Sequence, residues 1–382
     1  MIDQKEMEFA GRLFKKYYAG TRIDIEKIIQ KEFGFGDFNN KISFRHFAFK
    51  TNEEFNNYLR TKGPGFISFS SAFYMHPAAR PMPNKIWNGS ELIFDLDAND
   101  LDLQCAKEHG GSWVCRNCFD SVKQETLRLV EDFLVPDFGF SKNGISINFS
   151  GNRGYHVHVN NGDVLWLSSD ARKQISGYIK AEGLDLEAFF PSLGQRGQVL
   201  HGPMPDDFGY GGKLARFVIS MLNRNDINEL LAMNIEKPVA RKLLAKKADI
   251  ILGITTGNWD KVNLQKKREV WKSLLQKIAI RQSNSIDKNV TNDIHHLIRV
   301  PDTLHGDTGL VSKTVPLGRL QDFDPMEDAV AFASQETVKI HVKNAPEFSM
   351  KGEEFGPFNE QDAELPLHAA LYLILKGRAT LT

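Results

Sequence analysis

LIFDLD, residues 92–97, is an apolar run that ends in two aspartates separated by one residue. Such a run predicts a β-strand in which Asp95 and Asp97 lie on one face, with the apolar side chains packed behind them. The two Cα atoms are then roughly 6.6 Å apart, and the carboxylates can bind two divalent cations about 3.5–4 Å from each other. Oxygen ligands favour Mg²⁺ or Mn²⁺. The alternative is a strand end whose acids simply face water.

A second motif, ISINFSGNRGYHVHV, spans residues 145–159. Apolar residues alternate on both sides of the polar segment SGNRG, which predicts two strands joined by a turn. The backbone beside glycine, the Ser150 hydroxyl and the Arg153 guanidinium supply donors suited to phosphate. We interpret Ser150, Arg153 and His156 as a phosphate-binding set, and His158 as a partly buried neutral residue. The alternative is an ordinary turn with a solvated arginine.

A third polar segment, residues 285–309, holds four acids, three histidines and an arginine around a short apolar stretch. The acids are Asp287, Asp293, Asp302 and Asp307. Periodicity does not indicate which of them is a metal ligand, because all four lie in or beside turns. Taken alone, this segment is also compatible with a polar loop between strands.

The three cysteines of the chain fall in one stretch, Cys105-x3-His109-x5-Cys115-x2-Cys118. Three thiolates and an imidazole form a complete tetrahedral ligand set, which is typical of structural Zn²⁺. An odd number of cysteines argues against a disulfide framework. The alternative is three unrelated free thiols, and His109 is the least secure of the four ligands.

Length and composition limit the class of protein. The chain has 382 residues, 41% of them hydrophobic, so it can bury a sizeable core, and it is long for one domain. Its formal net charge is zero, unlike that of a strongly basic, autonomous DNA-binding protein. No apolar run approaches the roughly 20 residues that cross a bilayer, and the charged N-terminus is unlike a signal peptide. We expect a cytoplasmic protein that does not bind membranes.

Hydrophobic periodicity predicts an α/β (α+β) protein with an inserted helical subdomain. Helices are expected near residues 7–18, 24–31 and 120–133, and strands near residues 42–49, 65–70, 91–97, 296–300 and 338–342. The pattern is mostly helical from about 168 to 280. Residues 1–167 and 281–382 are therefore expected to form one α/β domain, into which residues 168–280 are inserted.

Together these motifs resemble the small, catalytic subunit of the archaeal and eukaryotic type of DNA primase, and the archaeal form more closely. FDLD at 94–97 resembles the family's metal-binding Asp-x-Asp, and SGNRGYH at 150–156 its Ser-Gly-x-Arg-Gly-x-His motif. The resemblance implies that Asp287 is the third metal ligand and that Arg299 and His305 bind the triphosphate. It also implies the zinc knuckle at 105–118 and a mixed sheet in the catalytic domain. His296 matches a polar position of less certain role.

The resemblance implies DNA-templated synthesis of short primers on single-stranded DNA for replication, from nucleoside triphosphates, by a two-metal mechanism. A large subunit carrying an iron–sulfur domain is the implied partner, in a heterodimer, and the implied location is the cytoplasm beside the nucleoid. The alternatives are a stand-alone primase-polymerase of DNA repair and a non-catalytic nucleotide-binding or DNA-binding subunit. Eukaryotic members commonly have a second arginine where this chain has Asn152, so one phosphate contact is missing or comes from elsewhere.

Several basic and aromatic residues upstream are weaker candidates. Arg45 interrupts a strand-like stretch, where its charge must face solvent or an anion. Residues of a proline-containing loop are interpreted as part of a template or primer groove, with a rigid surface loop as the alternative. These loop residues are Tyr74, His76, Arg80 and Lys85.

Overall fold

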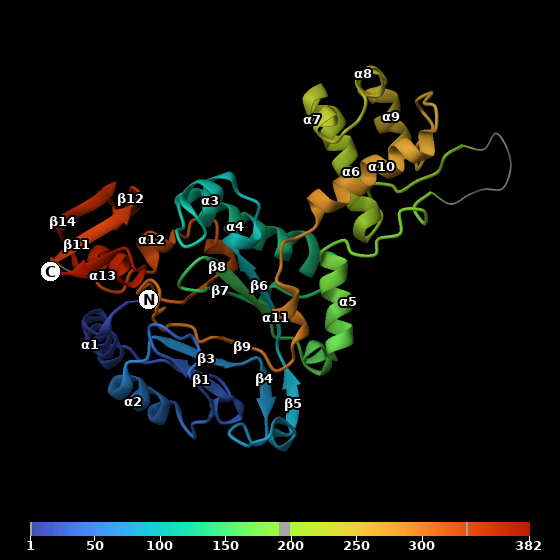
Figure 1. Ribbon diagram of the computed structural model, residues 1–382. Helices are drawn as coiled ribbons and strands as arrows, with labels where there is room; N and C mark the ends of the chain where they lie inside the picture. The colour runs from blue at the N-terminus through green and yellow to red at the C-terminus, as the bar shows by residue number, and fades with distance from the viewer. Residues whose placement is uncertain (1, 191–198, 334) are drawn as a thin grey trace. The chain divides into compact units, whose positions relative to one another are not determined.

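The computed structural model describes residues 2–190, 199–333 and 335–382. Residues 1, 191–198 and 334 fall within the predicted domain ranges and lie outside the described residues. The chain divides into two compact units (Figure 1). We call Met1–Arg128, Phe140–Gln174 and Ser285–Thr382 the sheet unit, and Leu129–Gly139 with Ile175–Asn284 the helical unit. The predicted α+β class is confirmed, and the pairings between the described strands are antiparallel.

The first four-stranded sheet of the sheet unit has the order β2-β1-β3-β9. Its strands are β1 (Phe33–Gly36), β2 (Phe44–Phe47), β3 (Phe66–Ser70) and β9 (Leu297–Arg299). Helices α1 (Gln4–Gly20) and α2 (Asn52–Lys62) lie beside it in Figure 1. Buried aromatic side chains of the strands and helices share one core, so the first sheet and its helices stabilise each other.

The second four-stranded sheet has the order β10-β7-β8-β6. It comprises β6 (Leu92–Asp97), β7 (Ile145–Phe149), β8 (Gly154–Val159) and β10 (Lys313–Val315). Three helices of the sheet unit flank the motifs in the sequence: α3 (Gln104–His109), α4 (Arg116–Arg128) and α11 (Lys288–Asn292). This sheet contains the Asp-x-Asp strand and the hairpin that the sequence predicted.

The remaining strands form smaller sheets. β4 (Ala72–Tyr74) pairs with β5 (Trp87–Ser90), and β12 (Phe348–Met350) pairs with β13 (Glu353–Phe355). A three-stranded sheet contains β11 (Thr337–Ala345), β14 (Phe358–Pro366) and β15 (Ala379–Leu381). The short helix α12 (Pro325–Asp328) precedes β11, and the buried helix α13 (Leu367–Leu375) precedes β15.

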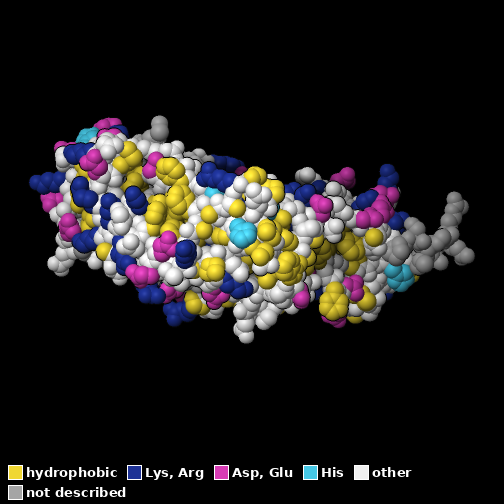
Figure 2. Space-filling model, turned by 90° about the horizontal axis from the view of Figure 1, so that it is seen from below, with side chains coloured by type: hydrophobic (Ala, Val, Ile, Leu, Met, Phe, Trp, Pro, Cys, Tyr) yellow, Lys and Arg dark blue, Asp and Glu magenta, His cyan; other side chains and the backbone are white. Residues whose placement is uncertain are grey.

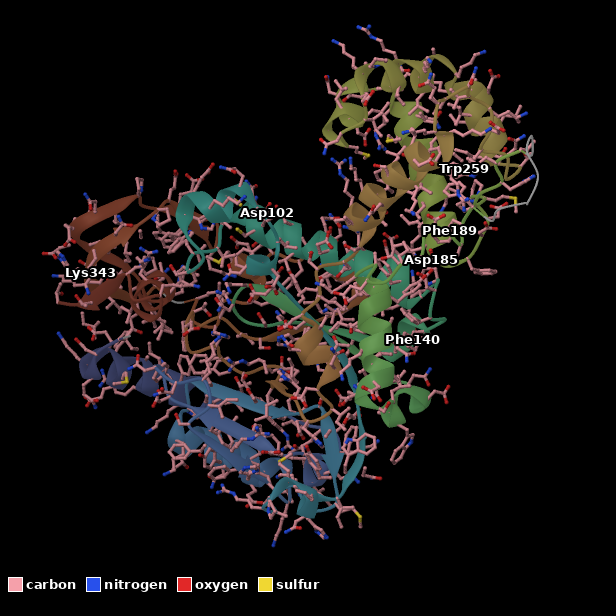
Figure 3. All side chains as sticks on the ribbon, turned by 45° about the vertical axis from the view of Figure 1, so that its right-hand side comes forward. Asp102, Phe140, Asp185, Phe189, Trp259 and Lys343 are labelled. Atoms are coloured by element: carbon pink, nitrogen blue, oxygen red, sulfur yellow. The ribbon has the colours of Figure 1, made fainter. Side chains whose placement is uncertain are left out.

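The helical unit has its own hydrophobic core. It contains α6 (Gly209–Arg224), α7 (Ile227–Ala232), α8 (Lys237–Ala245), α9 (Lys247–Ile254) and α10 (Lys267–Gln282). A π-helix, Leu129–Leu134, also belongs to it, and α5 (Ser169–Ile179) spans the boundary between the units. Trp259, labelled in Figure 3, packs edge-on against Trp271 with ring centroids 4.9 Å apart. Such aromatic packing, with the aliphatic side chains of the helices around it, gives this unit a core of its own.

The helix expected at residues 24–31 is wrong. Only Ile28–Gln30 form a 3₁₀ turn, and the preceding residue, Lys27, has a φ of 51°. The backbone N–H groups of Ile23 and Ile25 donate to Asn side chains of α2, so they do not take part in a helix. Side-chain hydrogen bonds of this kind compete with local helix formation.

The surface is mixed in charge. On the face shown in Figure 2, Lys and Arg side chains are interspersed with Asp and Glu, and hydrophobic side chains are exposed between them. This agrees with the zero net charge and means that anion binding depends on local clusters. Among the described residues, no helix combines the length and the apolar character needed to span a bilayer.

Candidate active site and metal centre

Strand β6 carries the two paired acids on its more accessible face. Its apolar residues are buried, whereas Asp95 and Asp97 each expose 27% of the side chain. The predicted alternation is therefore confirmed. β6 runs antiparallel to β8, with Asp95 opposite His156 and Asp97 opposite Gly154. The register thus brings the first motif directly against the second.

Gly154 lets the two strands approach each other at Asp97. A Cβ atom at this position would lie 1.9 Å from the carbonyl oxygen of Leu96 and 3.0 Å from the Cα of Asp97. Real Cβ atoms do not come so close to backbone, so any side chain here would displace β6. The glycine is needed for close packing of the backbones, independently of any anion.

Asp287 lies next to Asp95. It caps the N-terminus of α11 by accepting the backbone N–H of Asn289, and its own N–H donates to the carbonyl oxygen of Asp95 over 2.9 Å. Burial, Asp97 and Asp287 raise the pKa of Asp95 to about 7. Crowded carboxylates that disfavour each other's charge are typical of sites that bind cations.

The chemistry of these three acids fits a divalent cation of the Mg²⁺ or Mn²⁺ type, since all their ligand atoms are carboxylate oxygens. Their oxygens do not form a compact set with mutual distances below 4.8 Å in the described part of the chain. Instead, Arg153 donates to Asp97 Oδ2 from Nη2 (2.9 Å) and Nε (3.1 Å). The guanidinium therefore partly balances the charge of the acids in this structure.

The turn between β7 and β8 is held by its own serine. Ser150 Oγ accepts the backbone N–H groups of Asn152 (3.3 Å) and Gly154 (3.2 Å). No acceptor for its hydroxyl hydrogen lies among the described residues, so this hydrogen can be donated to a ligand. His156 is 6% exposed, its Nε2 is 3.6 Å from Asp95 Oδ1, and its buried Nδ1 has no hydrogen-bond partner among the described residues. Burial lowers the pKa of His156 well below its usual value, so this imidazole is neutral at pH 7.

Arg299 and His305 meet at Phe66. The Arg299 guanidinium lies 5.0 Å from the Phe66 ring centroid, and the His305 ring packs edge-on against the same ring at 5.2 Å. The buried Nη1 of Arg299 has no hydrogen-bond partner in the described part of the chain. An unsatisfied buried donor is costly and indicates a place for a ligand. Arg299 also helps to lower the pKa of His156, after burial and His158, which indicates that it lies near the second motif.

The other acids of the third segment lie in different surroundings. The N–H of Asp307 donates to His305 Nδ1 over 3.1 Å, and the Asp302 carbonyl accepts the Tyr17 hydroxyl. Asp293 Oδ2 is 3.7 Å from His296 Nδ1, and this pairing with His296 lowers the pKa of Asp293. His296 in turn acts on the pKa of Asp95. Asp287, by contrast, is hydrogen-bonded to Asp95 and helps to raise its pKa.

The structure adds two features that the sequence did not indicate. Buried Glu32 accepts Arg45 Nε over 2.9 Å and lies 3.4 Å from Lys85 Nζ, so the anion that Arg45 faces is a carboxylate of the protein itself. Lys376 donates to Asn152 Oδ1 over 3.0 Å. The Lys376 contact joins residues 224 positions apart, and no local pattern could have revealed it. The Tyr74 hydroxyl is 2.9 Å from His295 Nδ1, and Arg80 donates to the carbonyl of residue 45.

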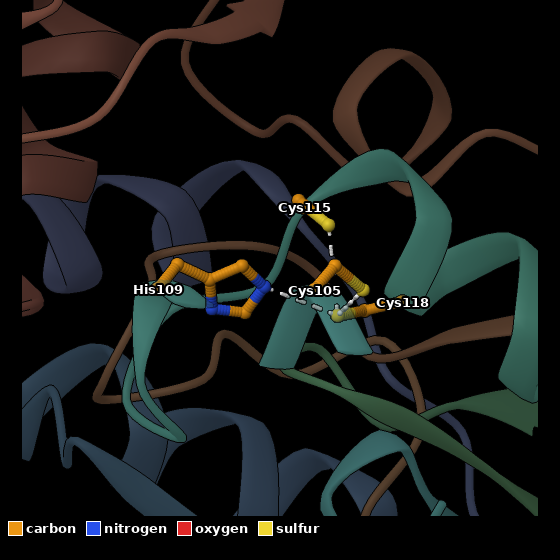
Figure 4. Close-up of side chains that lie close together, drawn as sticks. All are labelled: Cys105, His109, Cys115 and Cys118. Atoms are coloured by element: carbon orange, nitrogen blue, oxygen red, sulfur yellow. Dashed lines mark hydrogen bonds between the residues drawn. The ribbon is translucent and has the colours of Figure 1, made fainter. Parts of the chain in front are cut away.

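The four predicted zinc ligands converge (Figure 4). Their ligand atoms all lie within 4.8 Å of one another, with Cys118 Sγ 3.5 Å from Cys105 Sγ, 3.6 Å from Cys115 Sγ and 3.3 Å from His109 Nε2. Ligand atoms about 2.0–2.3 Å from a tetrahedral Zn²⁺ are separated by similar distances. The set leaves no position open, so it suits a structural rather than a catalytic ion.

The chain is similar in sequence to known proteins. A family model described as DNA primase small subunit matches residues 94–316, a range that starts in β6 and includes all three motifs. Proteins named DNA primase small subunit PriS are similar over nearly the whole chain. The one from Methanothrix thermoacetophila is 34% identical and that from Methanococcoides burtonii 33%, each over 99% of both chains. The one from Thermoplasma volcanium is 33% identical over 96% of this chain and 95% of its own. The chain belongs to the family of DNA primase small subunits.

Proposed function

We propose that this protein is the catalytic subunit of a primase that synthesises short primers on single-stranded DNA for replication. Membership of the primase small-subunit family supports primer synthesis as its activity. In the proposed reaction, the 3′-hydroxyl of one nucleotide attacks the α-phosphate of the next, and pyrophosphate leaves. A non-catalytic subunit is disfavoured because Asp95, Asp97 and Asp287 are all present.

The observation that carries this proposal is the neighbourhood of the three acids. The hydrogen bond from Asp287 N–H to the Asp95 carbonyl joins the third motif to the first, and burial together with the nearby charges of Asp97 and Asp287 raises the pKa of Asp95. Asp95, Asp97 and Asp287 would hold two Mg²⁺ or Mn²⁺ ions. When bound, such ions lower the pKa of an attacking hydroxyl and screen the charge of a leaving pyrophosphate.

The residues around the acids are suited to holding a triphosphate. Arg153 lies beside Asp97, and His156 Nδ1 and Arg299 Nη1, which are buried and have no partner among the residues that the structure describes, could bind phosphate oxygens. Ser150 and His305 complete the proposed set. Because these groups come from different strands and turns of one unit, their contribution is chiefly to position the phosphates in line for attack.

Zinc, partner and location complete the proposal. Cys105, His109, Cys115 and Cys118 would bind one structural Zn²⁺. The relatives are named small subunits, which supports assembly with a larger subunit in a heterodimer. An iron–sulfur domain would belong to that subunit, because all cysteines of this chain are in the proposed zinc site. We place the protein in the cytoplasm, near the nucleoid.

A primer-synthesis assay on single-stranded DNA tests the proposal. Each nucleotide type is supplied with Mg²⁺ or Mn²⁺, with and without the large subunit, and products are resolved by length. We expect template-dependent synthesis, and we expect Asp95→Asn or Asp97→Asn to abolish it while the circular dichroism spectrum is unchanged, because each removes a charge without leaving a cavity. Substantial synthesis by either folded variant would refute the role of these acids.

A further inference from the structure

Helix α13 brings a lysine to the turn between β7 and β8. All nine residues of α13 are buried, and Leu371 and Leu375 belong to the core of the sheet unit. Lys376 follows directly, and its Nζ donates to Asn152 Oδ1 over 3.0 Å and to the carbonyl oxygen of Ser112 over 3.3 Å. Since the helix is anchored in the core, the fold itself determines where this amine lies.

Lys376 lines a cavity of about 290 Å³ in the sheet unit. Arg153, Asn152 and Asp307 also line it. Two of these residues connect the cavity with the proposed triphosphate site, because Arg153 donates to Asp97 and the N–H of Asp307 donates to His305. The cavity therefore adjoins the place where the phosphates of a nucleotide would be held.

The chemistry of the cavity favours an anion. An ammonium has three N–H donors, and the two oxygens that Lys376 contacts belong to an amide and a backbone carbonyl, which are neutral. The ammonium also lies 5.6 Å from the ring centroid of Tyr372, and among the described residues no third oxygen accepts a hydrogen bond from it, so one N–H can be donated to a ligand. A phosphate oxygen placed between Lys376 and Arg153 would accept charge-assisted hydrogen bonds from both. The carboxylate of Asp307, which also lines the cavity, would repel it.

We propose that Lys376 and Arg153 form a subsite for the terminal phosphates of the incoming nucleoside triphosphate. This inference rests on the proposed function. In the SGNRG turn Arg153 is the single cation, because position 152 is asparagine. Lys376 supplies a second cation at the same turn from 224 residues further along the chain.

A purely structural role for Lys376 predicts a different effect of its substitution on ligand binding. If Lys376 only connects α13 with the turn and with the loop at Ser112, its substitution would weaken the binding of all ligands by the same factor. As part of a phosphate subsite, it would affect triphosphates much more than monophosphates. The ratio of the two dissociation constants therefore separates the roles, because it cancels a general loosening of the site.

The experiment compares Lys376→Gln, Lys376→Arg and the double variant Asn152→Arg/Lys376→Gln with the wild type. Dissociation constants for a nucleoside triphosphate and the matching monophosphate are measured by calorimetry with Mn²⁺, and KM and kcat in primer synthesis. The control is Arg378→Gln, because Arg378 donates to Ser112 Oγ over 3.2 Å but does not line the cavity. All proteins are full-length.

We expect Lys376→Gln to weaken triphosphate binding about tenfold or more, the effect of one lost charge-assisted hydrogen bond, and to raise KM more than it lowers kcat. Monophosphate binding should change little. Lys376→Arg and the double variant should recover most of the affinity, since each restores a cation at the turn. Arg378→Gln should behave like the wild type.

Other outcomes overturn the subsite. If Lys376→Gln loses affinity for the triphosphate and the monophosphate by the same factor, the role of Lys376 is structural. If it binds single-stranded DNA more weakly and nucleotides as the wild type does, Lys376 contacts a phosphate of the DNA. If the wild type makes primers and Lys376→Gln has an unchanged KM, the subsite alone is wrong. If the wild type binds nucleotides but makes no primers even with the large subunit, the proposed function fails, and the binding ratio still decides the subsite.

Discussion

At the scale of single residues, the choice of Asp287 as third metal ligand is open to a direct test. Asp287 contacts Asp95, whereas Asp302 and Asp307 have partners elsewhere. We expect Asp287→Asn to abolish the chemical step, and Asp302→Asn to retain most activity. Steady-state and single-turnover rates of primer synthesis measure both. An active Asp287→Asn together with an inactive Asp302→Asn would show that the third motif is wrongly assigned.

Substituting a proposed phosphate-binding residue should change KM and kcat differently from substituting a proposed metal ligand. Arg299→Ala removes a cation that we propose contacts the phosphates already in the ground state, so we expect a higher KM with a smaller change in kcat. Initial rates over a range of nucleotide concentrations give both constants. The matched control is Arg319→Ala, a residue of the sheet unit outside the three motifs. A large fall in kcat with unchanged KM would instead assign Arg299 to the transition state alone.

The titration of Lys376 gives a prediction for pH. Burial lowers the pKa of Lys376 to about 8, and the charges that act on it are those of Asp307, Arg153, Asp97 and Arg378. The amine is charged below this pKa, so triphosphate affinity should fall as pH rises from about 7 to about 9. Lys376→Arg should flatten this part of the profile, because a guanidinium stays protonated. Identical profiles for the two proteins would contradict the prediction.

At the scale of secondary structure elements, local motifs were the most predictable part of the chain. The β6 strand, the β7–β8 hairpin and the clustering of the knuckle residues were all predicted, because the residues concerned lie within about 15 positions of one another in the sequence. Strand β1 was not expected, since half of its residues are glycine. The helix predicted at 120–133 begins earlier, at Arg116, and ends in a π-helix.

The knuckle is the element whose stability should depend on metal. α3 is only six residues long and has no buried residues, so it has little core of its own. We expect about one zinc per chain by elemental analysis, and its loss in Cys115→Ser, because a closed site tolerates no missing ligand. The control is Ser112→Ala, which leaves all four ligands in place. Full activity and folding without metal would remove the knuckle from the proposed role.

At the scale of the whole molecule, long-range contacts set the limit of prediction. Asp287 meets Asp95, and Lys376 meets Asn152, only because β6, α11 and α13 belong to one folded unit. Hydrophobic periodicity gives the type of each element but not its neighbours. The place of Asp287 was therefore expected from a family resemblance, and that of Lys376 was not expected at all.

A buried ion network joins the two large sheets and gives a prediction for stability. Lys31, just before β1, is 2.9 Å from Glu91, just before β6, and His158 on β8 is 2.9 Å from the same carboxylate. Burial raises the pKa of Glu91, but the charge of Lys31 and the hydrogen bond from His158 outweigh it and bring the pKa down to about 2. The ionised carboxylate is therefore favoured in the folded state.

Glu91→Gln should lower the free energy of unfolding by about 3–5 kcal/mol at pH 7, because it leaves Lys31 without its counter-charge. A carboxylate with a depressed pKa stabilises the fold above its unfolded pKa of about 4.3, and this stabilisation is lost as pH falls towards 2. The wild type should thus lose stability over this range more steeply than the variant. Urea unfolding at several pH values measures the difference, and parallel curves would contradict it.

The close contact between Gly154 of β8 and the backbone of Leu96 has a consequence for inherited variation. Every replacement at codon 154 adds at least one carbon atom where the neighbouring carbonyl oxygen leaves no room. A mutation to alanine would alter no charge, no ligand and no hydrogen-bonding side chain, yet it would push Asp97 out of position. A gene carrying it would encode every chemical group that the reaction needs and still yield an inactive enzyme.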